Sequence, residues 1–181
     1  MVIKSTEATS VLAIGVLAAN LLSKTTRVTG GNGVRRAQFS ERINAVMTKY
    51  TNQQLTAAEV IAELVEMAKE AVAEADRGKQ FSPPLRDDKV MSYDVVAQNE
   101  VSVDVMGDDV LAQIARDLVA TMRRYIKTDW TVREDVKAKL WASIKRLLRK
   151  YGYPPDQQPE AIVEVMRQME AVAPRMANAA S

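Results

Sequence analysis

Apolar residues recur every three or four positions along most of the chain, which is the period of an amphipathic helix. The first regular stripe predicts a helix over 39–50. The run Thr56-Ala57-Ala58-Glu59 is a capping box, in which hydroxyl and carboxylate each bind the other residue's backbone amide. It therefore predicts the start of a second helix, which Gly78 ends, and a shorter helix is expected over 87–98.

The same period continues through the second half of the chain. Gly107 precedes two acids, favoured in a first helical turn, and opens the next helix. A break is expected over 128–131, followed by a helix over 132–151 and a last helix with Pro159 in its first turn. No segment shows the two-residue alternation of a strand. The predicted fold is therefore all-α, an irregular bundle of about six helices.

The N-terminal segment follows a different pattern. An apolar run over 11–22 is too short to span a bilayer, and no clean signal-peptide cleavage site follows it. We expect a short helix or a poorly ordered extension there, joined to the rest by a flexible linker at Gly30-Gly31-Asn32-Gly33. The expected organisation is an extension over 1–37, a helical domain over 38–173 and a tail over 174–181.

Composition restricts the chemistry. The 181 residues include no Cys and no His, so disulfides, Cys/His zinc sites and imidazole bases are excluded. The 25 Lys and Arg nearly balance the 23 Asp and Glu, but they are unevenly distributed. Residues 56–77 hold six acids and two bases, whereas residues 121–151 hold ten bases and three acids. The chain therefore combines an acidic helix with a later basic one.

Two acidic patterns could indicate an enzyme. Asp87 and Lys89 match half of a metal-dependent nuclease site, but the acid that such a site takes from a neighbouring strand is missing. Acids in a first helical turn explain these residues without catalysis. The row from Glu63 to Glu74 has the helical spacing of a di-iron bundle but lacks its histidines, so a solvated acidic face is the preferred interpretation. No catalytic, cofactor-binding or metal-binding residue is assigned.

The basic helix carries the candidate site. One row holds Arg133, Lys137, Trp141, Lys145 and Arg149, and a neighbouring row holds Lys139, Arg146 and Lys150. Because an apolar stripe lies opposite, these cations occupy a defined outer surface. Such a surface could follow a phosphate backbone or dock on an acidic protein face, and it could also be an ordinary solvated helix face.

Several strings resemble one family. They are Asp129-Trp130-Thr131-Val132-Arg133-Glu134, then Arg149-Lys150-Tyr151-Gly152-Tyr153-Pro154-Pro155-Asp156, and upstream Val60-Ile61-Ala62-Glu63-Leu64-Val65-Glu66. Together they resemble the C-terminal helical region of the restriction subunit of type I restriction-modification enzymes. The resemblance covers about 39–172, and the first 37 residues show no counterpart.

The resemblance implies a role in assembly. The family's C-terminal domain is expected to hold the subunit to a methyltransferase and specificity core, with DNA bound indirectly or weakly, in the cytoplasm and without a membrane. ATP and Mg²⁺ belong to the parent enzyme, and no cofactor is expected in this chain, which lacks the ATPase and complete nuclease motifs. The alternative is a free-standing nucleic-acid-binding protein that uses the basic helix over 132–151.

Overall fold

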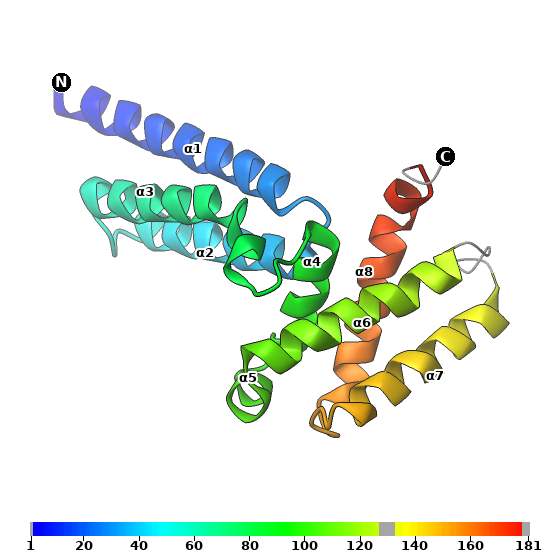
Figure 1. Ribbon diagram of the computed structural model, residues 1–181. Coiled ribbons are helices and arrows are strands. Elements are labelled where there is room, and N and C mark those ends of the chain that lie inside the picture. The colour runs from blue at the N-terminus through cyan, green and yellow to red at the C-terminus, as the bar shows by residue number, and fades with distance from the viewer. Residues whose placement is uncertain (1, 127–132, 179–181) are drawn as a thin grey trace. The chain divides into compact units, whose positions relative to one another are not determined.

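The computed structural model describes the backbone of residues 2–126 and 133–178, and the side chains of 9–125 and 133–173. Within these ranges it contains eight α-helices, a short 3₁₀ turn and no strand, which confirms the all-α prediction (Figure 1). The expected break over 128–131 lies outside the described residues. The chain divides into two compact units, 1–77 and 78–181.

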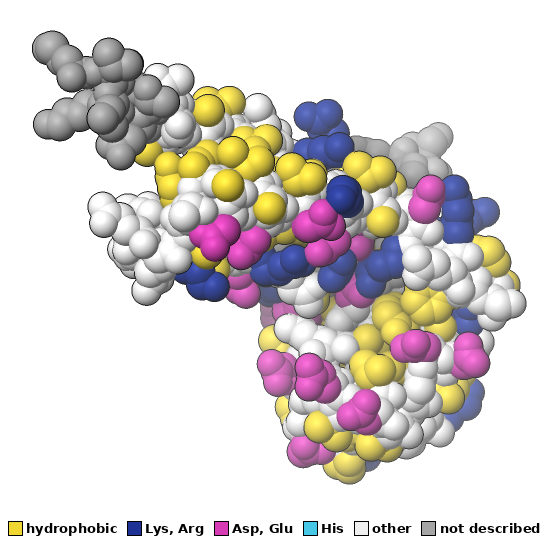
Figure 2. Space-filling model, turned by 90° about the vertical axis from the view of Figure 1, so that its left-hand side faces the viewer, with side chains coloured by type: hydrophobic (Ala, Val, Ile, Leu, Met, Phe, Trp, Pro, Cys, Tyr) yellow, Lys and Arg dark blue, Asp and Glu magenta, His cyan; other side chains and the backbone are white. Residues whose placement is uncertain are grey.

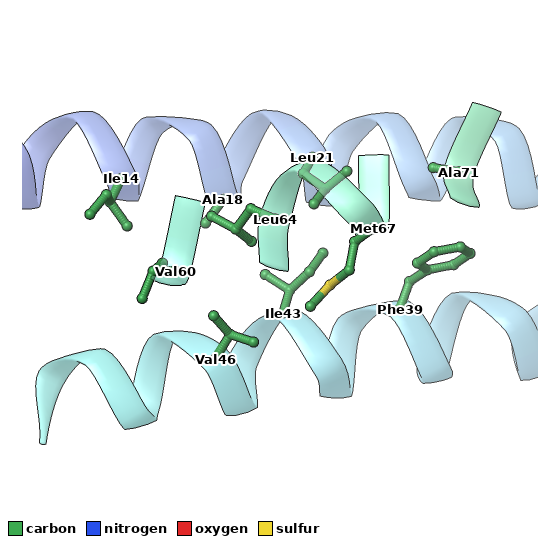
Figure 3. Packing of buried hydrophobic residues seen from close by; sticks show 10 residues of the cluster. All are labelled: Ile14, Ala18, Leu21, Phe39, Ile43, Val46, Val60, Leu64, Met67 and Ala71. Carbon is green, nitrogen blue, oxygen red and sulfur yellow. The ribbon is translucent and has the colours of Figure 1, made fainter. Parts of the chain in front are cut away.

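Three helices that pack pairwise form the first unit: α1 (Val2–Thr29), α2 (Gly33–Thr51) and α3 (Ala57–Glu74). Their inward side chains form one core, which includes Phe39 and Ile43 of α2 and Leu64 of α3 (Figure 3). The capping box is confirmed, because the Thr56 amide donates to Glu59 Oε2 at 2.7 Å and the Glu59 amide donates to Thr56 Oγ1 at 3.4 Å.

Of the two alternatives expected for the N-terminal residues, the structure shows a helix, and it is longer than expected. This helix is α1, which buries Ile14, Ala18 and Leu21 against α2 and α3. The glycine-rich segment is a tight turn in which Gly30 has a positive φ of 54° and Asn32 caps α2. The division at residue 37 stays a prediction about domain organisation, but α2 runs across that position. By length and composition, the segment Thr9–Thr29 of α1 could also cross a membrane, since its mean hydropathy is 1.3.

The second unit contains α4 (Asp87–Val96), α5 (Glu100–Met106), α6 (Asp108–Ile126), α7 (Glu134–Lys150) and α8 (Gln158–Asn178). Helix α6 contacts all four others, and its Leu111, Ile114 and Leu118 are fully buried. The sequence did not predict α5 as a separate helix. Asn99 caps the start of α5, because the Val101 amide donates a hydrogen bond to the Asn99 side chain. Gly107, with a φ of 74°, ends the helix.

Candidate functional site

Neighbouring acids neutralise the cations at the start of α7. Arg133 Nη2 lies 2.9 Å from Asp135 Oδ2. Lys137 Nζ lies 3.4 Å from Glu134 Oε1 and 3.8 Å from Glu170 Oε1 of α8. These two predicted site residues are therefore engaged inside the unit, and they lie about two to four helical turns away from the other cations of the row.

The second half of α7 is different. Within the described part of the chain, no carboxylate forms an ion pair with Lys145, Arg146, Arg149 or Lys150. Lys145 Nζ instead lies 4.8 Å from the ring centre of Trp141, a cation–π contact. Arg149 and Lys150 also stand in the last turn, where positive charge offsets the helix dipole. These four side chains therefore keep positive charge at the surface, which an acidic partner could neutralise.

A first groove lies beside this half of α7. It encloses about 480 Å³ and is lined by Trp141, Lys145 and Arg149 on one side. The turn and first residues of α8 line the other side, including Pro155 and Ile162. Trp141 is 39% exposed, so part of the indole contacts solvent. The groove combines an aromatic surface with two cations, which suits an acidic ligand that carries an apolar group.

A second groove, of about 610 Å³, lies between α6 and α7 and is lined by Arg124, Arg146 and Lys150. Its one lining carboxylate, that of Asp117, accepts a hydrogen bond of 2.7 Å from the Tyr151 hydroxyl. That hydrogen bond, together with burial, raises the pKa of Tyr151 above its usual range. Three cations therefore face this groove, one of them from α6.

The structure groups the candidate residues differently from the sequence. Trp141, Lys145 and Arg149 line one groove and Arg146 and Lys150 the other, whereas Arg133 and Lys137 are held by acids. Sequence reasoning did not assign Arg124 to the site. Arg124 belongs to the basic excess over 121–151, but it lies on α6, and only the packing of α6 on α7 brings it to the second groove.

The acidic patterns have structural partners. Asp88, in the first turn of α4, accepts a hydrogen bond of 2.7 Å from Arg123. Glu74 binds Arg35 at 2.8 Å and its side chain is only 6% exposed, so the α3 row is not entirely the solvated face that was expected. Among the described residues, no group of three or more Asp or Glu side chains could hold a metal ion.

Comparison with known proteins identifies the family. Residues 3–175 match the family described as type I restriction enzyme HindI endonuclease subunit-like, C-terminal. The match includes most of the first 37 residues, for which the sequence had suggested no counterpart. No solved structure matches the chain.

Two curated relatives agree with this family. The chain is 33% identical over 144 residues to the type I restriction enzyme HindI endonuclease subunit of Haemophilus influenzae, a stretch covering 80% of this chain and 14% of that protein. It is 33% identical over 122 residues to the putative type I restriction enzyme MjaIXP endonuclease subunit of Methanocaldococcus jannaschii, covering 67% and 11%. It thus spans about a seventh of the first relative, and it belongs to the family of C-terminal domains of type I restriction endonuclease subunits.

Proposed function

We propose that this chain is an assembly domain that docks on the methyltransferase core of a type I restriction-modification enzyme. The observation that carries the proposal is the second half of α7, where four cations have no acidic partner among the described residues and two of them, Lys145 and Arg149, line a groove with the exposed Trp141. We call Trp141, Lys145, Arg146, Arg149 and Lys150 the α7 cationic surface.

The chemistry of this surface suits a protein partner. Trp and Arg contribute disproportionately to binding energy when a partner covers them, and the Trp141 groove provides such a place. Complementary charge on the two proteins raises the rate at which they associate and orients them correctly. The partner surface is therefore acidic with an apolar side chain at its centre. The proposed domain needs no cofactor of its own.

The second candidate function is direct binding of nucleic acid. The observation that favours it is the α6–α7 groove, where three cations could follow a phosphate backbone. Such binding would weaken steeply as salt rises, because phosphate contacts release counterions. A protein interface with an aromatic centre depends on salt less strongly.

The experiment is co-elution of the full chain with a cognate methyltransferase and specificity complex at moderate salt, beside a mixture with DNA alone. We expect elution with the protein complex and not with bare DNA. The double variant Lys145→Glu/Arg149→Glu should bind the complex at least tenfold more weakly, because two attractive contacts become repulsive. Titration of the labelled chain measures this change.

The matched control is Lys139→Glu/Arg167→Glu, which makes the same charge change at cations that already pair with Asp135 and Glu164. Its affinity should stay within about twofold of the unaltered chain. Equal losses in both variants would show that net charge alone matters and would remove the α7 cationic surface from the proposal. Elution with DNA alone would favour the second candidate.

A further inference from the structure

A cavity of about 170 Å³ lies among three helices of the second unit, α4, α6 and α8, which pack against one another. Most of its lining is hydrophobic and consists of Met91, Met122, Val165, Met169 and Val172. The polar lining residues are Asp88, Ser92 and Gln168. None of these residues belongs to α7, so the cavity is separate from the two grooves beside the basic helix.

Three of the five hydrophobic lining residues are methionines. Hydrophobic side chains also reach the surface of the molecule (Figure 2), but Met91, Met122 and Met169 are each at most 8% exposed. The methionine side chain is unbranched and flexible, so it adapts its shape to the group that it contacts. The lining can therefore adjust to an apolar ligand while the three helices keep their positions.

The size of the cavity favours a small molecule over a polypeptide. A cavity of roughly 150 Å³ with hydrophobic walls holds one benzene molecule. The volume here, about 170 Å³, therefore suits a six-membered ring with a short substituent. A helix or an extended peptide would not fit among side chains that are almost completely buried.

The lining also contains a hydrogen-bond donor that lacks an acceptor. Gln168 is 7% exposed, and its Nε2 atom forms no hydrogen bond within the described part of the chain. Such a donor has lost water and gained nothing in return, and nearly all buried polar groups in native proteins are paired. The last torsion of a glutamine is soft, so a small rotation turns the amide toward a ligand in the cavity. An acceptor oxygen on that ligand would remove the cost.

The other polar lining residues already have partners. The Asp88 carboxylate accepts a hydrogen bond of 2.7 Å from Arg123, and Ser92 Oγ donates to the Asp88 carbonyl oxygen at 3.2 Å. A charged ligand would therefore lose its water in this cavity without meeting an unpaired opposite charge, which is costly. The lining thus selects a neutral molecule.

We propose that the cavity among α4, α6 and α8 binds a small neutral molecule that has an apolar ring and a carbonyl oxygen, which accepts a hydrogen bond from Gln168 Nε2. Aromatic and alicyclic ketones belong to this class. The hydrophobic side chains provide the affinity, and Gln168 orients the carbonyl group. The proposal rests on the cavity and the buried amide, and not on the proposed docking function.

The test uses two probes of the same shape, acetophenone and α-methylstyrene. A carbonyl oxygen in the first takes the place of a methylene group in the second, so the pair isolates the hydrogen bond. The full chain is labelled with ¹³C at its methionine methyl groups and titrated with each probe, and NMR follows the nine methionine signals. We expect saturable shifts at Met91, Met122 and Met169 that exceed those of the other methionines.

The variant Gln168→Leu removes the donor and keeps a side chain of similar size. Its affinity for acetophenone should fall about fivefold, the effect of one net hydrogen bond, while its affinity for α-methylstyrene stays within about twofold. The variant should also unfold at a higher temperature than the unaltered chain, because it no longer buries an unpaired donor.

The matched control is Gln158→Leu. Gln158 lies on the same helix and is also 7% exposed, but its Nε2 donates to the Tyr153 carbonyl oxygen at 2.8 Å. This variant should unfold at a lower temperature and bind acetophenone as the unaltered chain does.

Three results would overturn the proposal: no saturable shift in the unaltered chain, shifts spread evenly over all methionines, or a Gln168→Leu variant that binds both probes unchanged or loses both equally. If Gln168→Leu does not fold, Val172→Phe provides a second variant, because its ring occupies part of the cavity from a half-buried position. It should abolish the binding of both probes, and retained binding would equally contradict the assignment.

Discussion

Gly78 lies where the chain turns back toward α4, and the surrounding backbone leaves no room for a side chain. A Cβ at this position would lie 2.1 Å from the carbonyl oxygen of Leu85, whose amide donates a hydrogen bond of 2.9 Å to the Gly78 carbonyl. Because the obstacle is backbone and not a flexible side chain, the turn itself would have to move.

We therefore predict that Gly78→Ala lowers the free energy of unfolding by about 1–3 kcal/mol, the range for overpacked sites. Urea denaturation measures the change. Gly15 provides the opposite case, because it stands inside α1 with nothing within 4 Å of the position of its Cβ. Gly15→Ala should raise helix stability by roughly 0.5–1 kcal/mol. A neutral Gly78→Ala would contradict the close approach.

At the scale of elements, ion pairs join α2 to α3. Arg42 Nη2 lies 2.9 Å from Glu70 Oε1, and a second hydrogen bond makes the pair bidentate. These hydrogen bonds from Arg42 lower the pKa of Glu70 below its ordinary value of 4.5. The acidic row of α3 therefore holds helices together as well as facing solvent.

This pair predicts a pH dependence. Because the pKa of Glu70 is lower in the folded chain, its contribution is present above pH 4.5 and is lost as pH falls through the folded value. Both side chains are about half exposed, so the contribution is about 0.2–1 kcal/mol. Glu70→Gln should thus destabilise the chain at pH 7, and progressively less as the pH is lowered below 4.5, as measured by urea denaturation. A loss that stays the same as the pH is lowered would contradict the assignment.

The elements that the sequence predicted are those with a strong local signal. The capping box at Thr56 and the acids after Gly107 specify helix starts by themselves. Helix α1 was harder to predict, because both sides are apolar and no polar stripe reveals its period. Helix α5 depends on Asn99, whose side-chain amide also donates a hydrogen bond to Gln157, in the turn before α8, a contact that no local pattern contains.

The candidate site divides in the same way. The cations of α7 follow from spacing within one helix. Residues far away in the sequence decide which of these cations lack an acidic partner. Glu170 of α8 forms an ion pair with Lys137, and Arg124 of α6 adds a cation to the second groove. Sequence could therefore predict the basic surface, but only packing separates its neutralised half from its open half.

At the scale of the whole molecule, each of the two compact units buries hydrophobic side chains of its own among the described residues. The cluster that contains Phe39 draws only on residues from 14 to 71, whereas Leu140 of α7 is buried in the second unit. Phe39 is 1% exposed, and replacing its ring with a methyl group leaves a cavity. The energetic consequence should be confined to the unit that holds the ring.

We predict that Phe39→Ala destabilises the first unit by about 3–5 kcal/mol, while the amides of α6 and α7 keep most of their protection from hydrogen exchange. Hydrogen–deuterium exchange followed by mass spectrometry resolves the two units. Leu140→Ala is the reciprocal control and should release the amides of α7 first. Uniform loss of protection in either variant would mean that the units unfold together.

The position of Trp141 also gives the molecule an optical signal. The chain has two tryptophans, and Trp141 stands partly in water with the Lys145 ammonium over its ring. The emission of an indole moves to shorter wavelength when water leaves the ring. Occupation of the Trp141 groove would therefore shift the fluorescence emission maximum to shorter wavelength. The protein thus has an intrinsic fluorophore at the surface where a partner is proposed to bind.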